Sequence, residues 1–493
     1  MNKLAGWIIG NARNFPSRAG LEEEVPFAIW QRQWEVFDLT GDRQGSGRIA
    51  EKTESLSRHN DHYRLMTAIY KSQVQIYQGD YAGALVTAQG FLKTAPGETS
   101  PKQLALIYAQ IGQAYQNLSD FEKSIAYRKK AMDIFRQTGD TDSYGNGLAS
   151  LGMVNWKIGD YPKAMEFLEK AREMFEASGN QRSLATTITN IANVMLATDQ
   201  VEKARQQYVS TLGICRKIGD VAKQSAILNN LGSIFYRQGD YIKALEHYQV
   251  GYRLDLQLGN VTGQAAKLAN MAVLLASLGR HQESLEKFTQ ALKLDNASGN
   301  LEGQMKKLGN IASLYGLIGD FEKAMDCVDR AVDICRKINA QGYLGHCLGM
   351  RASFLTALKR YQEAEVSALD SLEMSRGSGN LSQLANTHNY LAEIYWNGKN
   401  FSQALEHSLQ SMKLMENHQL FEIYRENIYY SHSKVLQSTG QTGPARKFLN
   451  DAYHEVMKRV ESLPQGVSPD DFIRKNETLQ NIVREWKESR EQE

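Results

Sequence analysis

The sequence has few of the residues that break helices or cross-link a chain. It contains 8 prolines and 4 cysteines among 493 residues, and no proline occurs between Lys163 and Gly443. Proline disrupts a helix interior, so this long stretch is compatible with continuous helical packing. The scarcity of cysteine fits a cytoplasmic protein, and we interpret all four as small buried residues. They are Cys215, Cys327, Cys335 and Cys347.

The sequence also lacks an excess of charge and any long apolar run. Its 57 lysines and arginines nearly balance 55 aspartates and glutamates, the net charge is +2, and the two signs are interleaved. Nucleic acid or an anionic membrane would favour a basic stripe, which is missing. No run approaches the ~20 apolar residues of a membrane span, and the N-terminal AGWIIG is too short for a secretory signal. We therefore expect a cytoplasmic protein without nucleic-acid or membrane partners.

Motifs for catalysis and for metal or cofactor binding are missing as well. The glycines of GDRQGSGRIAEK at 41–52 lack the spacing of a phosphate-binding loop. His454 and Glu455 lack the second histidine of a zinc-protease motif, and His59 with His62 forms a pair without further ligands. The cysteines have no histidine or acid at a recognisable catalytic spacing. We expect no enzyme activity, no cofactor and no metal.

What the sequence does contain is a repeat of forty residues. Residues 228–260 illustrate it: two segments carry apolar residues at helical spacing, and each ends in a Gly-Asp or Gly-Asn pair. The unit is thus a helical hairpin, and glycine marks both of its ends along the chain. Glycine follows the first helix at 79, 159, 239, 279 and 319, and the second at 139, 179, 219, 259, 299 and 379.

Two columns of small residues keep the same period. Small side chains at fixed points let helices approach closely, so these columns predict where the two helices of a hairpin cross. In the first helix the column is Gly112, Gly152, Ala192, Gly232, Ala272, Ala312, Ala352 and Ala392. In the second it is Ala84, Ser124, Ala164, Ala204, Ala244, Ser284, Ala324, Ala364 and Ala404.

These columns, with an aromatic residue opening most second helices, resemble the tetratricopeptide repeat. The common form of that repeat has 34 residues, and a period of forty also falls in the range of HEAT and armadillo repeats. The small-residue columns and the equal helices favour the tetratricopeptide type, with each helix nearly one turn longer. Forty-residue versions are similar to those of spindle-orientation adaptors that bind Gα and of bacterial regulatory ATPases and cyclases. The resemblance implies an all-α superhelical solenoid of stacked antiparallel helix pairs.

The ends of the chain differ from the repeats. Residues 1–60 include NARNFPSRAGLEEEVPF and are expected to form a divergent hairpin that caps the solenoid. The repeats are expected over residues 61–460. Residues 461–493 begin with a PQGVSPDDF break and should end in a polar helix.

One column is not obviously required by packing. Asn190, Asn230, Asn270 and Asn310 lie forty residues apart in the first helices, and Asn193 adds to the cluster. Asparagine is a poor helix-interior residue. In the families that the sequence resembles, first helices line the concave face, and asparagines there hold the backbone of an extended peptide. A carboxamide offers a donor and an acceptor, which suits a peptide group. The alternative is that these carboxamides bond neighbouring helices and set the stacking of repeats.

Other residues near this face indicate a weak ligand preference. Arg237, Lys267 and Lys306 belong to the middle repeats and would favour acidic ligands, unless they are ordinary solvated charges. Tyr390 and Trp396 lie towards the C-terminus and predict an aromatic pocket, unless Trp396 packs against the next hairpin.

The sequence therefore predicts a non-catalytic scaffold that binds a protein or peptide segment in its concave groove. The alternative is a regulatory or sensor subunit that controls a separate cyclase, ATPase or phosphatase. A repeat RNA-binding protein is disfavoured by the balanced charge.

Overall fold

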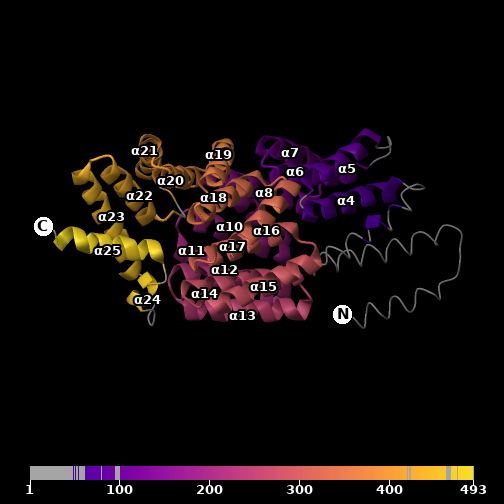
Figure 1. The fold of residues 1–493 in the computed structure, drawn as a ribbon. Coiled ribbons are helices and arrows are strands. Elements are labelled where there is room, and N and C mark those ends of the chain that lie inside the picture. The colour runs from indigo at the N-terminus through magenta and orange to yellow at the C-terminus, as the bar shows by residue number, and fades with distance from the viewer. Residues whose placement is uncertain are drawn as a thin grey trace. The chain divides into compact units, whose positions relative to one another are not determined.

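The computed structural model describes residues 48, 50, 51, 54, 61–78, 80–94, 100–418, 420, 423–461, 463, 468–474 and 476–491. Within this part of the chain the secondary structure is helical, with no strand (Figure 1). The helices are α4 (Asp61–Gln78), α5 (Tyr81–Thr94), α6 (Pro101–Asn117), α7 (Phe121–Gln137), α8 (Thr141–Ile158), α9 (Tyr161–Ser178), α10 (Gln181–Ala197), α11 (Val201–Lys217), α12 (Val221–Arg237), α13 (Tyr241–Leu258), α14 (Val261–Ser277), α15 (His281–Ser298), α16 (Leu301–Leu317), α17 (Phe321–Lys337), α18 (Gln341–Ala357), α19 (Tyr361–Ser378), α20 (Leu381–Asn397), α21 (Phe401–Asn417), α22 (Arg425–Ser438), α23 (Thr442–Glu461), α24 (Pro469–Arg474) and α25 (Glu477–Glu491).

The Gly-Asp and Gly-Asn pairs end one helix and begin the next. Gly159 closes α8 with φ 89°, in the left-handed region that favours glycine. Asp160 then caps α9, because its side chain accepts a hydrogen bond from the backbone N–H of Lys163 at 3.2 Å. The glycine therefore stops one helix while the acid or amide satisfies a free N–H of the following one.

The same left-handed conformation recurs every 20 residues from 119 to 399, including places where the sequence has no glycine. A side chain in this conformation costs roughly 1–2 kcal/mol. The repeat geometry thus imposes the conformation whatever residue is present. The non-glycine residues that adopt it are Ser119, Asp199, Asn339, Lys359 and Lys399.

Replacing Lys359 and Lys399 with glycine should therefore stabilise the protein. Both have φ near 60°, and a glycine removes the steric cost of the left-handed backbone while adding some unfolded-state entropy. We expect the free energy of unfolding to rise by about 0.5–1 kcal/mol for each change. The reverse change, Gly319→Ala at φ 81°, should lower it by a similar amount. Urea titrations followed by circular dichroism measure both, and a loss of stability in K359G would contradict the argument.

The chain divides into two compact units. The first comprises Met1–Ile234, Gln249–Gln264 and Ala297–Asn300, and the second Phe235–Tyr248, Ala265–Asn296 and Leu301–Glu493. In both units consecutive helices pack as stacked pairs, and first helices of successive pairs also contact one another, as α8 contacts α10 and α18 contacts α20. The predicted all-α solenoid of stacked helix pairs is confirmed.

The small-residue columns mark the helix crossings, as predicted. In the first unit a Cβ on Gly152 would lie 3.1 Å from the carbonyl oxygen of Ala164, its counterpart in the second column. Where the second column holds serine, the hydroxyl donates to the facing backbone: Ser124 bonds the carbonyl of Gly112 at 2.7 Å. In the second unit Ser284 bonds the carbonyl of Ala272 in the same way, also at 2.7 Å. A serine here satisfies its own hydroxyl without pushing the helices apart.

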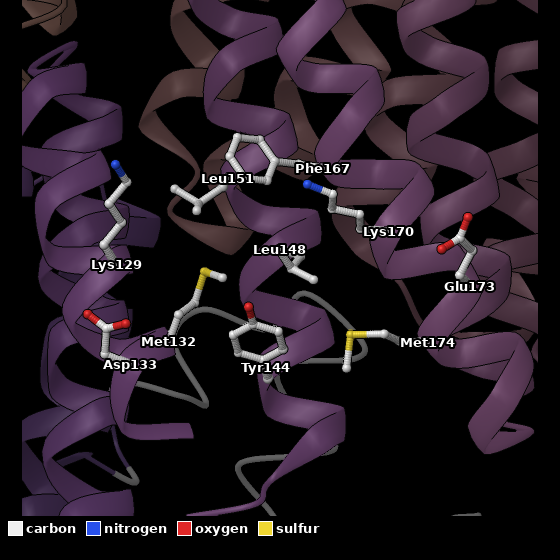
Figure 2. A pocket seen from close by; sticks show the side chains of 10 residues that line it. All are labelled: Lys129, Met132, Asp133, Tyr144, Leu148, Leu151, Phe167, Lys170, Glu173 and Met174. Atoms are coloured by element: carbon white, nitrogen blue, oxygen red, sulfur yellow. The ribbon is translucent and has the colours of Figure 1, made fainter. Parts of the chain in front are cut away.

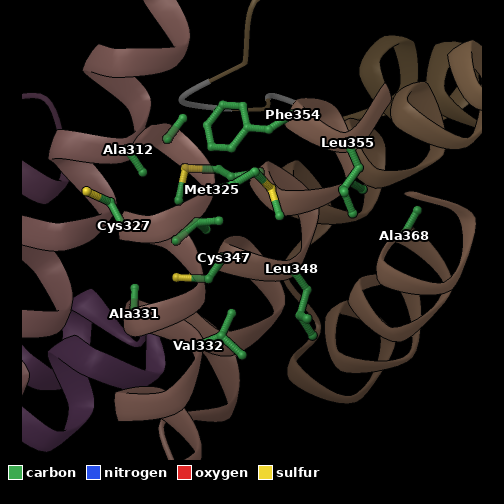
Figure 3. Packing of buried hydrophobic residues seen from close by; sticks show 14 of the residues in the cluster. Ala312, Met325, Cys327, Ala331, Val332, Cys347, Leu348, Phe354, Leu355 and Ala368 are labelled. Atoms are coloured by element: carbon green, nitrogen blue, oxygen red, sulfur yellow. The ribbon is translucent and has the colours of Figure 1, made fainter. Parts of the chain in front are cut away.

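The core of the second unit includes sulfur-containing residues between α16 and α19 (Figure 3). Cys327, Cys335 and Cys347 are all buried there, and Cys215 is buried in the first unit, so the interpretation of the cysteines as small core residues is confirmed. A hydrogen bond with the Cys335 thiol, together with burial, raises the pKa of Cys347 well above its usual range. The Cys347 thiol is therefore a poor nucleophile.

Most of the predicted cap at residues 1–60 lies outside the described residues. At the other end, α25 is amphipathic: Leu479 and Ile482 are buried, and Trp486 stacks on Tyr453 with 3.8 Å between ring centroids. No helix among the described residues combines the length and apolar character that crossing a bilayer requires.

Candidate functional site

The asparagine column lies on the first helices of successive repeats, and its members have different surroundings. In the first unit Asn190 on α10 and Asn230 on α12 are half-buried. In the second unit Asn270 on α14 is half-buried and Asn310 on α16 is exposed. The side chains of Asn190 and Asn310 make no hydrogen bond with the described residues. These two carboxamides are therefore available to a ligand.

Asn193 is occupied by a contact that the sequence did not reveal. The hydroxyl of Tyr208 on α11 donates to the Asn193 carboxamide oxygen, and Asn230 bonds the same hydroxyl. Tyr208 is fully buried, and desolvation raises its pKa well above the usual range. Asn193, and in part Asn230, therefore have a structural role, because their carboxamides form hydrogen bonds with the buried Tyr208 hydroxyl.

The basic residues do not form the expected ligand-facing cluster. Lys267 is 5% exposed, so its ammonium is buried rather than presented to a groove. Lys306 is exposed and pairs with Glu302 on its own helix at 2.6 Å. Arg237 is exposed at the end of α12. Because Lys267 is buried and Lys306 is paired within its own helix, these side chains do not support the predicted preference for acidic ligands.

The C-terminal aromatic residues belong to the packing between hairpins. The indole N–H of Trp396 donates to Ser438 Oγ at 2.9 Å, and the ammonium of Lys434 lies 4.6 Å from its ring centroid. The alternative in which Trp396 packs on the next hairpin is therefore correct. Tyr390 lies against Gly349, and burial, with a smaller effect of Glu393, raises its pKa to about 12. No open aromatic pocket forms from these residues.

A buried polar cluster in the second unit was missed by sequence reasoning. The Nδ1 atoms of His388 on α20 and His407 on α21 are 2.9 Å apart, and the His407 ring stacks on Tyr395 at 5.5 Å. Tyr395 in turn donates to Glu365 Oε1 at 2.7 Å. Burial, with a smaller effect of His407, lowers the pKa of His388 to about 4, and burial also lowers that of His407. The pair is therefore uncharged at neutral pH.

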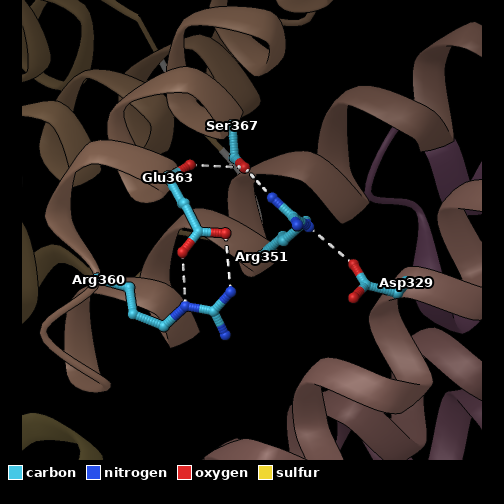
Figure 4. A network of polar contacts seen from close by, with 5 residues as sticks. All are labelled: Asp329, Arg351, Arg360, Glu363 and Ser367. Carbon is cyan, nitrogen blue, oxygen red and sulfur yellow. Dashed lines mark hydrogen bonds and ion pairs between the residues drawn. The ribbon is translucent and has the colours of Figure 1, made fainter.

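Ion pairs and hydrogen bonds link α17, α18 and α19 in the same unit (Figure 4). Arg351 on α18 donates to Asp329 of α17 at 2.7 Å and to Ser367 of α19 at 2.5 Å. Arg360 forms a bidentate pair with Glu363, at 2.7 Å for both bonds. This network ties three helices together. Among the described residues, no group of three or more His, Cys, Asp or Glu side chains is placed to hold a metal ion.

A groove lies in the first unit, between the second helices α7 and α9 and above the first helix α8 (Figure 2). We call it the α7–α9 groove. Its volume is about 510 Å³. Its rims carry Lys129 and Asp133 on α7 and Lys170 and Glu173 on α9. Its floor is apolar and comprises Met132, Tyr144, Leu148, Leu151, Phe167 and Met174. Sequence analysis did not find it, since it depends on how three helices stack.

Comparison with known proteins agrees with the repeat architecture. The family model of the tetratricopeptide repeat matches residues 103–177, 183–257 and 264–337. The model of anaphase-promoting complex subunit 5 matches residues 315–398. A comparison with curated proteins gave no match.

Solved structures with similar helix arrangements include the following three proteins. A Rap protein in complex with competence and sporulation factor has 15% identity and a TM-score of 0.48, over 72% of this chain and 98% of that one. Aspartyl phosphate phosphatase F from Bacillus subtilis has 13% identity and a TM-score of 0.47, over 73% and 97%. NprR in complex with its cognate peptide NprX has 18% identity and a TM-score of 0.42, over 58% and 84%. At these values the similarity bears on the fold alone.

Proposed function

Because the chain is a tetratricopeptide-repeat protein, we propose that it is a non-catalytic scaffold that holds an extended peptide segment along the first helices of its repeats. The contacts within each unit are the asparagines of this column, on α10 and α12 in the first unit and on α14 and α16 in the second. The single observation that carries the proposal is that Asn190 and Asn310, at equivalent positions of different repeats, keep their carboxamides free of other side-chain bonds. A helix-interior asparagine without a structural partner is costly unless it has another use.

The spacing of the helices suits an extended ligand. Neighbouring helices pack roughly 8–10 Å apart, and an extended chain advances ~3.3 Å per residue, so each first helix meets about every third ligand residue. A carboxamide both donates to a carbonyl and accepts from an N–H, and it therefore binds a peptide group without reading the side chain. Ligand sequence would be selected by the residues between these contacts.

The experiment is a selection from a displayed library of unstructured 12-residue peptides on the full-length protein. The affinity of an enriched peptide is then measured by calorimetry for the wild type and for N190A/N310A. Each net hydrogen bond contributes roughly 0.5–1.5 kcal/mol, so the double variant should bind about 5-fold to 150-fold more weakly. Its melting temperature should hold or rise, because alanine is the better helix former.

Asn193→Ala is the matched control. It deprives the buried Tyr208 hydroxyl of its acceptor, so it should lower the melting temperature by an amount corresponding to roughly 1–3 kcal/mol. Undiminished peptide affinity in N190A/N310A, or a selection that enriches no binder, would show that the column does not clamp a peptide.

A further inference from the structure

The α7–α9 groove is separate from the asparagine column, and its floor is apolar, whereas the column consists of polar carboxamides. Its six floor residues present a single polar group, the hydroxyl of Tyr144. The backbone of α8 beneath them is already hydrogen-bonded within its helix. A peptide bound there in extended form would lose hydration from its own N–H and C=O groups without gaining partners, which is costly. The floor instead suits a segment whose backbone bonds are internal, namely an α-helix.

The rims specify the charges that such a helix should carry. Asp133 is engaged by Arg136 at 3.1 Å and Lys170 by Glu166 at 2.6 Å, each within its own helix. Lys129 and Glu173 form no ion pair with the described residues, and both are exposed. They stand on opposite walls of the groove. A complementary helix therefore carries acidic residues on the flank facing α7 and basic residues on the flank facing α9.

A local sequence feature explains the depth of the floor at this repeat. Position 147 of α8 is glycine, whereas the equivalent positions in the neighbouring repeats are Ile107 and Thr187. A Cβ on Gly147 would lie 2.5 Å from Cγ of Met132, so Met132 occupies space that a side chain takes elsewhere. Any residue larger than glycine pushes Met132 away from α8. The groove at this point is thus a consequence of one missing side chain.

We propose that the α7–α9 groove is a docking site for an amphipathic α-helix of a partner protein. Leucine or methionine side chains of that helix contact Met132, Phe167 and Met174, and methionine suits such a surface because its flexible thioether adapts to varied shapes. An acidic flank pairs with Lys129 and a basic flank with Glu173.

The probe is a fluorescein-labelled synthetic helix of about 18 residues with a leucine stripe, glutamates along one flank and lysines along the other. A second probe has lysines on both flanks. Fluorescence anisotropy measures the binding of each to the full-length protein. The wild type should bind the acid–base probe saturably. Lys129→Glu places acidic side chains at both position 129 and position 173. The variant should therefore bind the acid–base probe about 3-fold more weakly, and the lysine–lysine probe more tightly, than the wild type does.

Gly147→Ala tests the floor without touching the rims. Met132 should be displaced into the groove, and the affinity for the acid–base probe should fall by about 10-fold. The control is Gly213→Ala on α11, where an added Cβ meets no atom within 4 Å and the affinity should not change. Circular dichroism verifies that each variant is folded. Absence of saturable binding to the wild type, equal affinities of G147A and G213A, or an unchanged probe preference in K129E would overturn the proposal.

Discussion

Replacing Asp295 alone with alanine should lower the free energy of unfolding by about 3–5 kcal/mol. The Asp295 carboxylate on α15 lies 2.9 Å from the Lys307 ammonium on α16, and the two side chains are 0% and 10% exposed. Removing the carboxylate leaves a cation in an apolar environment without its partner, and the desolvation cost of that cation is then uncompensated. Urea titration of the full-length variant, followed by circular dichroism, should show an earlier loss of helix.

Replacing both partners should cost much less than replacing one. At the equivalent positions forty residues later the chain has Cys335 and Cys347, which fill the same place as a pair of buried thiols. The double variant D295C/K307C copies that solution, and exchanging a buried ion pair for apolar groups is often close to neutral. The control is Lys306→Ala, which breaks an exposed pair with Glu302 and should change stability by about 0.5 kcal/mol or less. Equal losses in D295A and D295C/K307C would show that the unpaired charge is not the cause.

Stability should fall steeply as the pH decreases from about 6.5 to about 4. Burial lowers the pKa of His388 to about 4, with His407 adding to the shift, and burial lowers the pKa of His432 to about 4. In the unfolded chain each histidine takes up a proton near pH 6.5, whereas the folded chain resists protonation until about pH 4. The contribution of these two histidines to the free energy of unfolding is therefore fully present above about pH 6.5, and it decreases as the pH falls below that value. At pH 4 the loss is about 3 kcal/mol for each of these two histidines.

Charged side chains near these histidines also shift their pKa values and so affect the pH dependence of stability. Arg376 and His407 add to the lowering at His388, while Glu406 partly opposes it at His407. His432 accepts or donates a hydrogen bond with Ser408 at 2.9 Å. The double variant H388Q/H432Q removes both titrating rings and should flatten the dependence of the melting temperature on pH. His454 is exposed, and H454Q serves as the control with an unchanged profile. A profile for H388Q/H432Q that stays as steep as that of the wild type would contradict this assignment.

Local sequence determined the helices, their ends and their crossings. The period of forty residues, the Gly-Asp pairs and the small-residue columns act through contacts within one hairpin. Gly159 with Asp160, and Gly152 against Ala164, illustrate this. Such features depend on residues that are close in sequence, and therefore they can be predicted without knowing how hairpins stack. Even Lys359 and Lys399 adopt the left-handed conformation that the period requires.

Tertiary structure alone decided which polar side chains are free for function. Asn193 and Asn190 are one turn apart on α10, yet only Asn193 meets Tyr208 of the following helix. Lys306 and Lys307 are adjacent in sequence, but one is exposed and the other is buried against Asp295. Burial and partners of this kind depend on the rotation and spacing of neighbouring helices, which small differences in many packed side chains set together. A periodic sequence specifies which face of a helix a residue occupies, but it does not specify what the adjacent repeat places opposite that face.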